Sequence, residues 1–87
     1  MRFLAHVRVM PKAEVADPQG NAVCHALNTL GYTGVGEVRA GKFMEVILEA
    51  KEQEEARTQV AEMCRKILSN PVIEEFSFEI RALEHRG

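Results

Sequence analysis

Three histidines and two cysteines are the side chains of this sequence that most often bind metals or attack substrates. His6, His25 and His85 fall in three separate parts of the chain, and none belongs to an HxxxH pair that would place two ligands on one helix face. Cys24 directly precedes His25, but successive side chains of a helix diverge by about 100°, too far for the histidine to act as a base. Cys64 falls on the apolar stripe of a predicted helix and is interpreted as a small buried hydrophobe. The spacing therefore predicts neither a zinc site nor a cysteine nucleophile.

Glycines between residues 34 and 42 could form a phosphate-binding loop, because glycine-rich loops can bind phosphate groups. Their spacing matches neither GxGxxG nor GxxxxGKS/T, and no helix is predicted after Lys42 to direct its N-terminus at a ligand. We interpret these glycines as turn residues of a hairpin. Phe43 is the only aromatic residue of that hairpin and shares a strand face with Glu45, which is unfavourable for the base-stacking surface of an RNA-binding domain. We predict no catalytic residue and no nucleic-acid partner.

The composition is that of an ordinary globular domain with a slight negative charge. Charged residues make up 28% and apolar residues 46% of the 87 residues, and a formal net charge of -2 gives no attraction to nucleic acid or anionic membranes. No apolar run approaches the roughly 20 residues of a membrane helix. Residues 1–6 become polar too early for a signal peptide, and two cysteines are few for a small secreted protein. We expect one domain over residues 1–87, located in the cytoplasm.

Hydrophobic periodicity and turn residues divide the chain into six elements. Apolar residues alternate in the strand segments and follow helical spacing in two others. Asp17 and Pro18 suit the N-cap and the first position of the first helix, and Gly31 suits its end. Asn70 and Pro71 end the second helix, because the residue before a proline avoids helical geometry. The expected elements are strand 3–10, a helix from Pro18 to before Gly31, a hairpin of strands 35–39 and 43–50 around Gly41, helix 53–68, strand 72–82, and a frayed tail at 84–87.

The order β-α-β-β-α-β predicts an α+β fold of ferredoxin-like order. We expect a four-stranded, mainly antiparallel sheet with both helices on one face, because two helices can cover only one side of such a sheet. The covered face would take Val7, Val9, Val46, Leu48, Phe76 and Phe78. The opposite face carries too many apolar side chains to remain in water, so it is the expected surface for self-association in a dimer or tetramer. The apolar residues of this candidate oligomer interface are Leu4, Met10, Phe43 and Ile47.

Four segments carry a family resemblance. They are residues 17–20 (DPQG) running into 25–31 (HALNTLG), residues 38–45 (VRAGKFME), residues 62–68 (EMCRKIL) and residues 70–76 (NPVIEEF). In content and order they resemble the PurS family, the small subunits of phosphoribosylformylglycinamidine synthase. Together they cover most of the chain at near-family length. The departures are Ala16, where a larger aliphatic residue is common, Phe76 and Phe78, where tyrosine is common, and the short charged tail.

The resemblance implies an accessory role in an ATP-dependent ligase of de novo purine biosynthesis. PurS-like chains assemble with a glutaminase subunit and a larger ATP-binding synthetase subunit, bridge the two and help ammonia pass between them. The complex converts formylglycinamide ribonucleotide, ATP and glutamine to formylglycinamidine ribonucleotide, ADP, phosphate and glutamate. ATP and magnesium would belong to the partners, and this chain would bind no cofactor and have no catalytic activity alone.

Arg39 and Lys42 are the candidate docking residues for the synthetase subunit. They place two cations around a predicted tight turn in a net acidic chain, and exposed loops on rigid scaffolds commonly bind partners. The alternative is that both are solvated turn charges. A different function also stays open at this point, namely a stand-alone ferredoxin-like domain that senses a small molecule.

Overall fold

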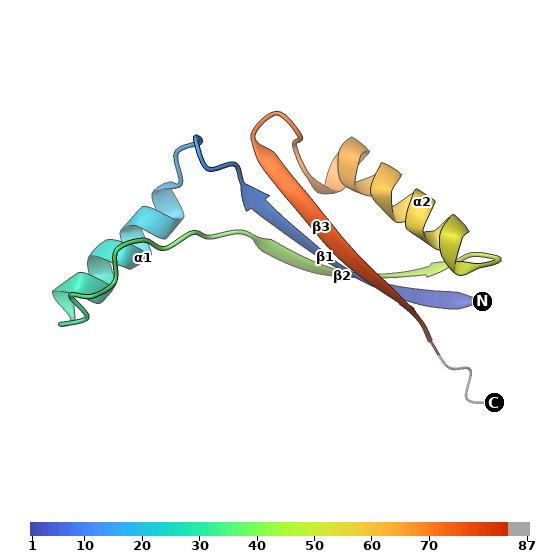
Figure 1. The fold of residues 1–87 in the computed structure, drawn as a ribbon, viewed down its shortest axis with the longest axis horizontal. Coiled ribbons are helices and arrows are strands. Elements are labelled where there is room, and N and C mark those ends of the chain that lie inside the picture. Colours follow the sequence, from blue (N-terminus) through green and yellow to red (C-terminus); the bar gives the residue numbers. More distant parts are fainter. Residues whose placement is uncertain (84–87) are drawn as a thin grey trace.

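The chain forms an antiparallel sheet of three strands with one helix packed on it and a second helix held away from it (Figure 1). The computed structural model describes residues 1–83, so the predicted tail 84–87, with His85, lies outside the described residues. The elements in chain order are β1 (Arg2–Pro11), α1 (Pro18–Thr29), β2 (Lys42–Glu49), α2 (Gln53–Met63), a π-helical turn η1 (Cys64–Leu68) and β3 (Glu74–Ala82). The α+β class, both helices and three of the four predicted strands are confirmed.

Strand β1 lies in the centre of the sheet, in the order β2-β1-β3, and pairs antiparallel with both neighbours. Val7 lies opposite Met44 on one side and opposite Phe78 on the other. Because side chains alternate along a strand, this register puts the predicted apolar sets of all three strands on one face. The strand patterns therefore placed each residue on the correct side of the sheet.

The core lies between that face and α2. Ala56, Val60 and Cys64 of the helical segment are completely buried, and they lie over fully buried residues of β1 such as Val7. Burial raises the pKa of the Cys64 thiol, since desolvation disfavours the thiolate. Cys64 is thus a buried hydrophobe, as its place in the sequence indicated.

The predicted helix 53–68 ends in a wider turn than its pattern suggested. The backbone N–H and the hydroxyl of Ser69 both donate to the Cys64 carbonyl, five residues back. This π-type bond adds a residue to the last turn and changes the direction of the side chains that follow. Ile67, which belonged to the predicted apolar stripe, is consequently 79% exposed.

The predicted hairpin does not form, and the four-stranded sheet is wrong for this chain by itself. Residues 35–39 form no strand and pair with no strand of the described chain, and residues 40–41 lead into β2 instead of reversing (Figure 1). Gly41 lies against the backbone of Val9 and the side chain of Met10, where a Cβ would find no room. The glycine therefore allows a close approach to β1 rather than a tight turn.

The placement of both helices on one sheet face is also wrong for the single chain. Helix α1 and the segments that join it to the sheet, residues 12–41, project from one end of the sheet, and we call them the arm (Figure 1). The Cα radius of gyration is 17.0 Å, against about 12 Å for a compact chain of this length. The only buried residue of α1 is Gly20. The molecule is therefore a small half-covered sheet with an unsupported helix.

Candidate docking surfaces

The sheet face opposite α2 brings the four predicted interface residues onto one surface. Leu4 lies opposite Ile47 in the ladder, and Phe43 lies opposite Arg8. Phe43 and Ile47 are 56% and 55% exposed, whereas Leu4 is only 8% exposed and Met10 is half-buried. Two of the four side chains, both on β2, therefore project far enough to contact another molecule.

Two pairs of polar or charged side chains on this face lie across neighbouring strands. His6 Nε2 lies 3.0 Å from Glu45 Oε2, and Arg8 Nη1 lies 3.3 Å from Glu79 Oε1. Phe43 lies close to both His6 and Arg8, with its ring centroid 5.2 Å from the His6 ring and 5.7 Å from the Arg8 guanidinium carbon. Exposed ion pairs contribute little to stability, usually less than about 1 kcal/mol. The exposed Phe43 ring thus has both an arginine and carboxylates around it, and this mixture of charges suits contact with a protein surface better than contact with a polyanion.

Arg39 and Lys42 lie where the arm leaves the sheet, not at a hairpin tip. The Arg39 guanidinium donates a hydrogen bond to the carbonyl of Pro11, the last residue of β1. Lys42 Nζ lies 3.8 Å from Glu74 Oε2, across the end of the sheet. Both cations thus have partners within the chain. The Lys42 side chain is still 59% exposed, and Arg39 is also exposed.

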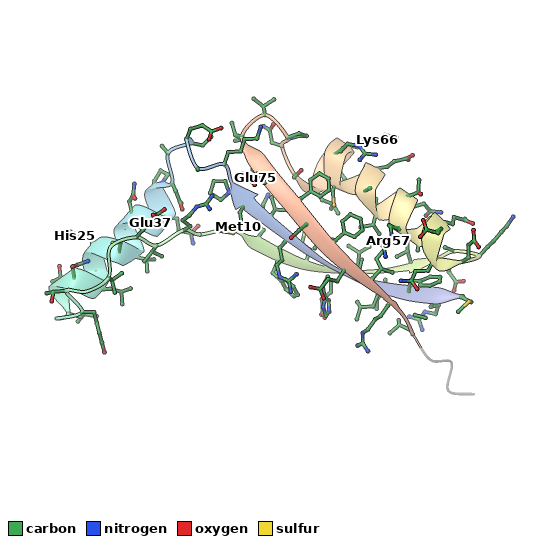
Figure 2. The ribbon with its side chains drawn as sticks, in the orientation of Figure 1. Met10, His25, Glu37, Arg57, Lys66 and Glu75 are labelled. Atoms are coloured by element: carbon green, nitrogen blue, oxygen red, sulfur yellow. The ribbon has the colours of Figure 1, made fainter. Side chains whose placement is uncertain are left out.

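A shallow hollow of about 190 Å³ lies beside this junction. It is lined by Arg8, Met10, Arg39, Glu75, Phe76 and Ser77. Figure 2 shows Met10 and Glu75 near the point where the arm meets the sheet, far from Arg57 and Lys66 on α2. The hollow combines two arginines with a glutamate, so it has no single charge that would select an anion or a cation.

A hydrogen-bonded clasp fixes the base of the arm. Asp17 Oδ1 accepts from the backbone N–H of Gly20 at 3.0 Å, the predicted N-cap bond, and Oδ2 accepts from the N–H of Ala40 at 2.9 Å. These bonds, to Gly20 first and to Ala40 second, lower the pKa of Asp17, and the charge of Arg39 acts in the same direction. The second bond crosses 23 residues of sequence, so no local pattern could have revealed it.

Helix α1 is held to the segment that follows it by a small set of contacts. Asn28 Nδ2 donates to the Val35 carbonyl at 3.0 Å, and the Cys24 thiol lies 3.8 Å from the same oxygen. Gly20 lies against the Val38 carbonyl with no space for a side chain. Cys24 is therefore half-buried beside a carbonyl, with no base close to it among these contacts, and His25 is exposed on the arm (Figure 2).

Within residues 1–83 no group of three His, Cys, Asp or Glu side chains is arranged to hold a metal ion. In the same part of the chain no helix has the length and apolarity needed to span a bilayer.

Comparison with known proteins identifies the family. The profile of PurS, described as phosphoribosylformylglycinamidine (FGAM) synthase, matches residues 4–82. The PurS subunit of Synechocystis is 46% identical over 94% of this chain and 82% of its own length. The Bacillus subtilis subunit is 46% identical over 90% of this chain and 92% of its own length.

Solved structures agree with the sequence comparison. The structure of B. subtilis PurS superimposes with a TM-score of 0.83 at 41% identity, covering 92% of this chain and 99% of that one. A chain in the structure of PurLQS from Thermotoga maritima superimposes with a TM-score of 0.85 at 28% identity, covering 93% and 99%. The extended arm is therefore part of a shared fold and not a peculiarity of this sequence. The chain belongs to the PurS family of phosphoribosylformylglycinamidine synthase subunits.

Proposed function

We propose that this chain bridges the glutaminase and synthetase subunits of phosphoribosylformylglycinamidine synthase and supports the transfer of ammonia between them. The observation that carries the proposal is the match along almost the whole chain to PurS subunits, one of them solved within PurLQS. The chemistry of such an enzyme joins the amide nitrogen of glutamine to formylglycinamide ribonucleotide at the expense of ATP. In this proposal ATP and magnesium bind the partner subunits, and the complex works in the cytoplasm.

The surfaces of this chain support a docking role. The open sheet face, with Phe43 and Ile47 projecting from it, is proposed to associate with a second copy, with Leu4 and Met10 at its less exposed positions. A charge-balanced face around exposed apolar groups is typical of a protein interface. The stand-alone sensor considered from the sequence is not favoured, because the relatives that match are subunits of the synthase.

Arg39 and Lys42 are proposed to dock the synthetase subunit. Their position at the junction of arm and sheet keeps the two cations within one small exposed region, close to the hollow beside β3. Their bonds to Pro11 and Glu74 orient them for contact with an acidic surface. Orientation by bonds within the chain lowers the entropy lost when such side chains are immobilised in a complex.

Reconstitution of the three-subunit enzyme tests the proposed function. Omitting this chain should abolish most of the glutamine-dependent synthesis while the synthesis supplied directly with ammonium salt continues, because only the glutamine route needs the glutaminase held in place. The measurement is the rate of formylglycinamidine ribonucleotide formation with each nitrogen source. Equal rates with and without this chain on glutamine would refute a bridging role.

A further inference from the structure

The hollow beside the junction of arm and sheet lies where the two strand ladders end at different levels. The β1–β2 ladder ends at Val9, whereas the β1–β3 ladder continues to Pro11. Beyond Val9 the arm still approaches β1, through the contact of Gly41 and the hydrogen bond from Arg39 to Pro11, but it adds no ladder pair. The sheet therefore has a step at this corner, and the hollow of about 190 Å³ is located there.

Three charged side chains meet at the hollow. Arg8 and Glu75 belong to the open sheet face, on β1 and β3, and Arg39 belongs to the arm. Pockets for drug-sized ligands usually measure about 300–1,000 Å³, so this hollow has room only for a small metabolite. The other residues that line it are Met10, Phe76 and Ser77.

Both arginines are held in place by groups that do not line the hollow. Arg8 Nη1 lies 3.3 Å from Glu79 Oε1, and its guanidinium carbon lies 5.7 Å from the centre of the Phe43 ring. Arg39 is held by the Pro11 carbonyl. A guanidinium has five N–H donors, so each arginine keeps donors for a ligand after these bonds. Side chains that are already oriented lose less entropy when a ligand binds.

Glu75 supplies the opposite charge. It lies across the ladder from Met10, and Figure 2 shows both side chains near the junction. Among residues 1–83 no cationic side chain pairs with Glu75, whereas the neighbouring Glu74 pairs with Lys42. The Glu75 carboxylate is therefore available to an ammonium group of a ligand.

We propose that the hollow binds a free acidic α-amino acid such as L-glutamate. The α-ammonium group of the ligand lies against Glu75. Its α-carboxylate accepts hydrogen bonds from Arg8, in the bidentate manner that a guanidinium allows, and from the Ser77 hydroxyl. The side-chain carboxylate of the ligand pairs with Arg39, and its methylene groups lie on Met10.

The mixture of charges is what selects this class of ligand. A simple anion would face Glu75, and a simple cation would face two arginines. A neutral α-amino acid would leave Arg39 without an ionic partner. The α-ammonium and α-carboxylate groups occur on one carbon only in a free amino acid, so a peptide segment does not satisfy the same contacts. Glutamate is also a product of the proposed reaction; that connection rests on the proposed function, whereas the site itself does not.

Amide nuclear magnetic resonance spectra of the full chain test the site. Titration with sodium L-glutamate at constant ionic strength should give saturable shifts centred on Met10, Arg39 and Ser77. Glutarate has both carboxylates but no ammonium group, and L-glutamine has no side-chain charge, so both should bind more weakly. Shifts that do not saturate, shifts centred on another part of the chain, or equal affinity for glutamate and glutarate would each overturn the proposal.

Variants of the charged residues separate the contacts. Glu75→Gln should weaken glutamate binding by up to about fivefold, the range of an exposed ion pair, and should leave glutarate binding equal or stronger. Arg8→Gln should weaken the binding of both acids. The matched controls on α2, Glu62→Gln and Arg57→Gln, should change neither, since Arg57 lies far from the hollow (Figure 2).

The spectra of the variants also show whether each one is folded, through the dispersion of amide shifts outside the hollow. Unchanged glutamate affinity in folded Glu75→Gln, or an equal loss for glutamate and glutarate, would refute the assigned contact. The titration uses this chain without the other subunits. A failure to bind glutamate would therefore leave the bridging role intact, and a failed reconstitution of the enzyme would leave the site intact.

Discussion

Replacement of Gly20 by alanine should destabilise the protein, although alanine normally favours a helix. A Cβ at this position would lie less than 3.0 Å from the Val38 carbonyl oxygen and from the Asp17 carboxylate. Alanine in place of glycine favours a helix by roughly 0.5–1 kcal/mol. Overpacking against a fixed backbone costs about 1–3 kcal/mol, because the helix must move away from residues 35–40. The clash should therefore outweigh the gain in propensity.

The assay is thermal unfolding followed by circular dichroism at one fixed chain concentration, because self-association makes the midpoint depend on concentration. Each kcal/mol should lower Tm by roughly 4–8 °C in a domain of this size. Gly36→Ala is the matched control, since a Cβ there would meet nothing within 4 Å. If Gly20→Ala unfolds at or above the temperature of the unmodified chain, α1 does not pack on the Val38 backbone as described.

Three further predictions concern the ionisable residues. Because the pKa of Asp17 is lowered in the folded chain, its ionised form stabilises the fold at pH values above the ordinary aspartate pKa of about 4. This contribution to stability is lost as the pH falls through the lowered pKa of the folded chain. The difference in Tm between the unmodified chain and Asp17→Asn should therefore shrink on acidification, and a constant difference would refute the assignment. The Cys64 thiol should react with a thiol reagent only on unfolding, because burial and the raised pKa suppress its thiolate, whereas Cys24 should react in the native protein. Equal rates of reaction for the two thiols in the native protein would contradict this. The double change Arg39→Glu and Lys42→Glu should reduce assembly with the synthetase and make its association less salt-dependent, while wild-type affinity would show that these cations do not dock a partner.

Much of the fold follows from patterns that are local in the sequence. Two-residue alternation placed the side chains of β1, β2 and β3 on the correct faces, since the pleat of a strand fixes which way successive residues point. The start of α1 follows from Asp17 and Pro18, because the cap bond to Gly20 spans only three residues. The resemblance in four segments indicated the family, which the comparisons confirm. A search for single catalytic residues could not have identified the family, because such a chain acts through its surfaces.

The path of residues 35–41 was decided by the tertiary structure. Gly41 is equally suited to a hairpin turn and to close packing on a neighbouring strand, so its identity does not choose between them. The choice depends on the Asp17–Ala40 bond and on the contact of Gly41 with Val9, which join parts of the chain far apart in the sequence. The sequence by itself determined both helices, the strands β1, β2 and β3 and the apolar sides of these strands, because those properties depend on neighbours within a few residues. Whether the first helix covers its own sheet or stands free as an arm is set by contacts at long range, and only the folded chain reveals them.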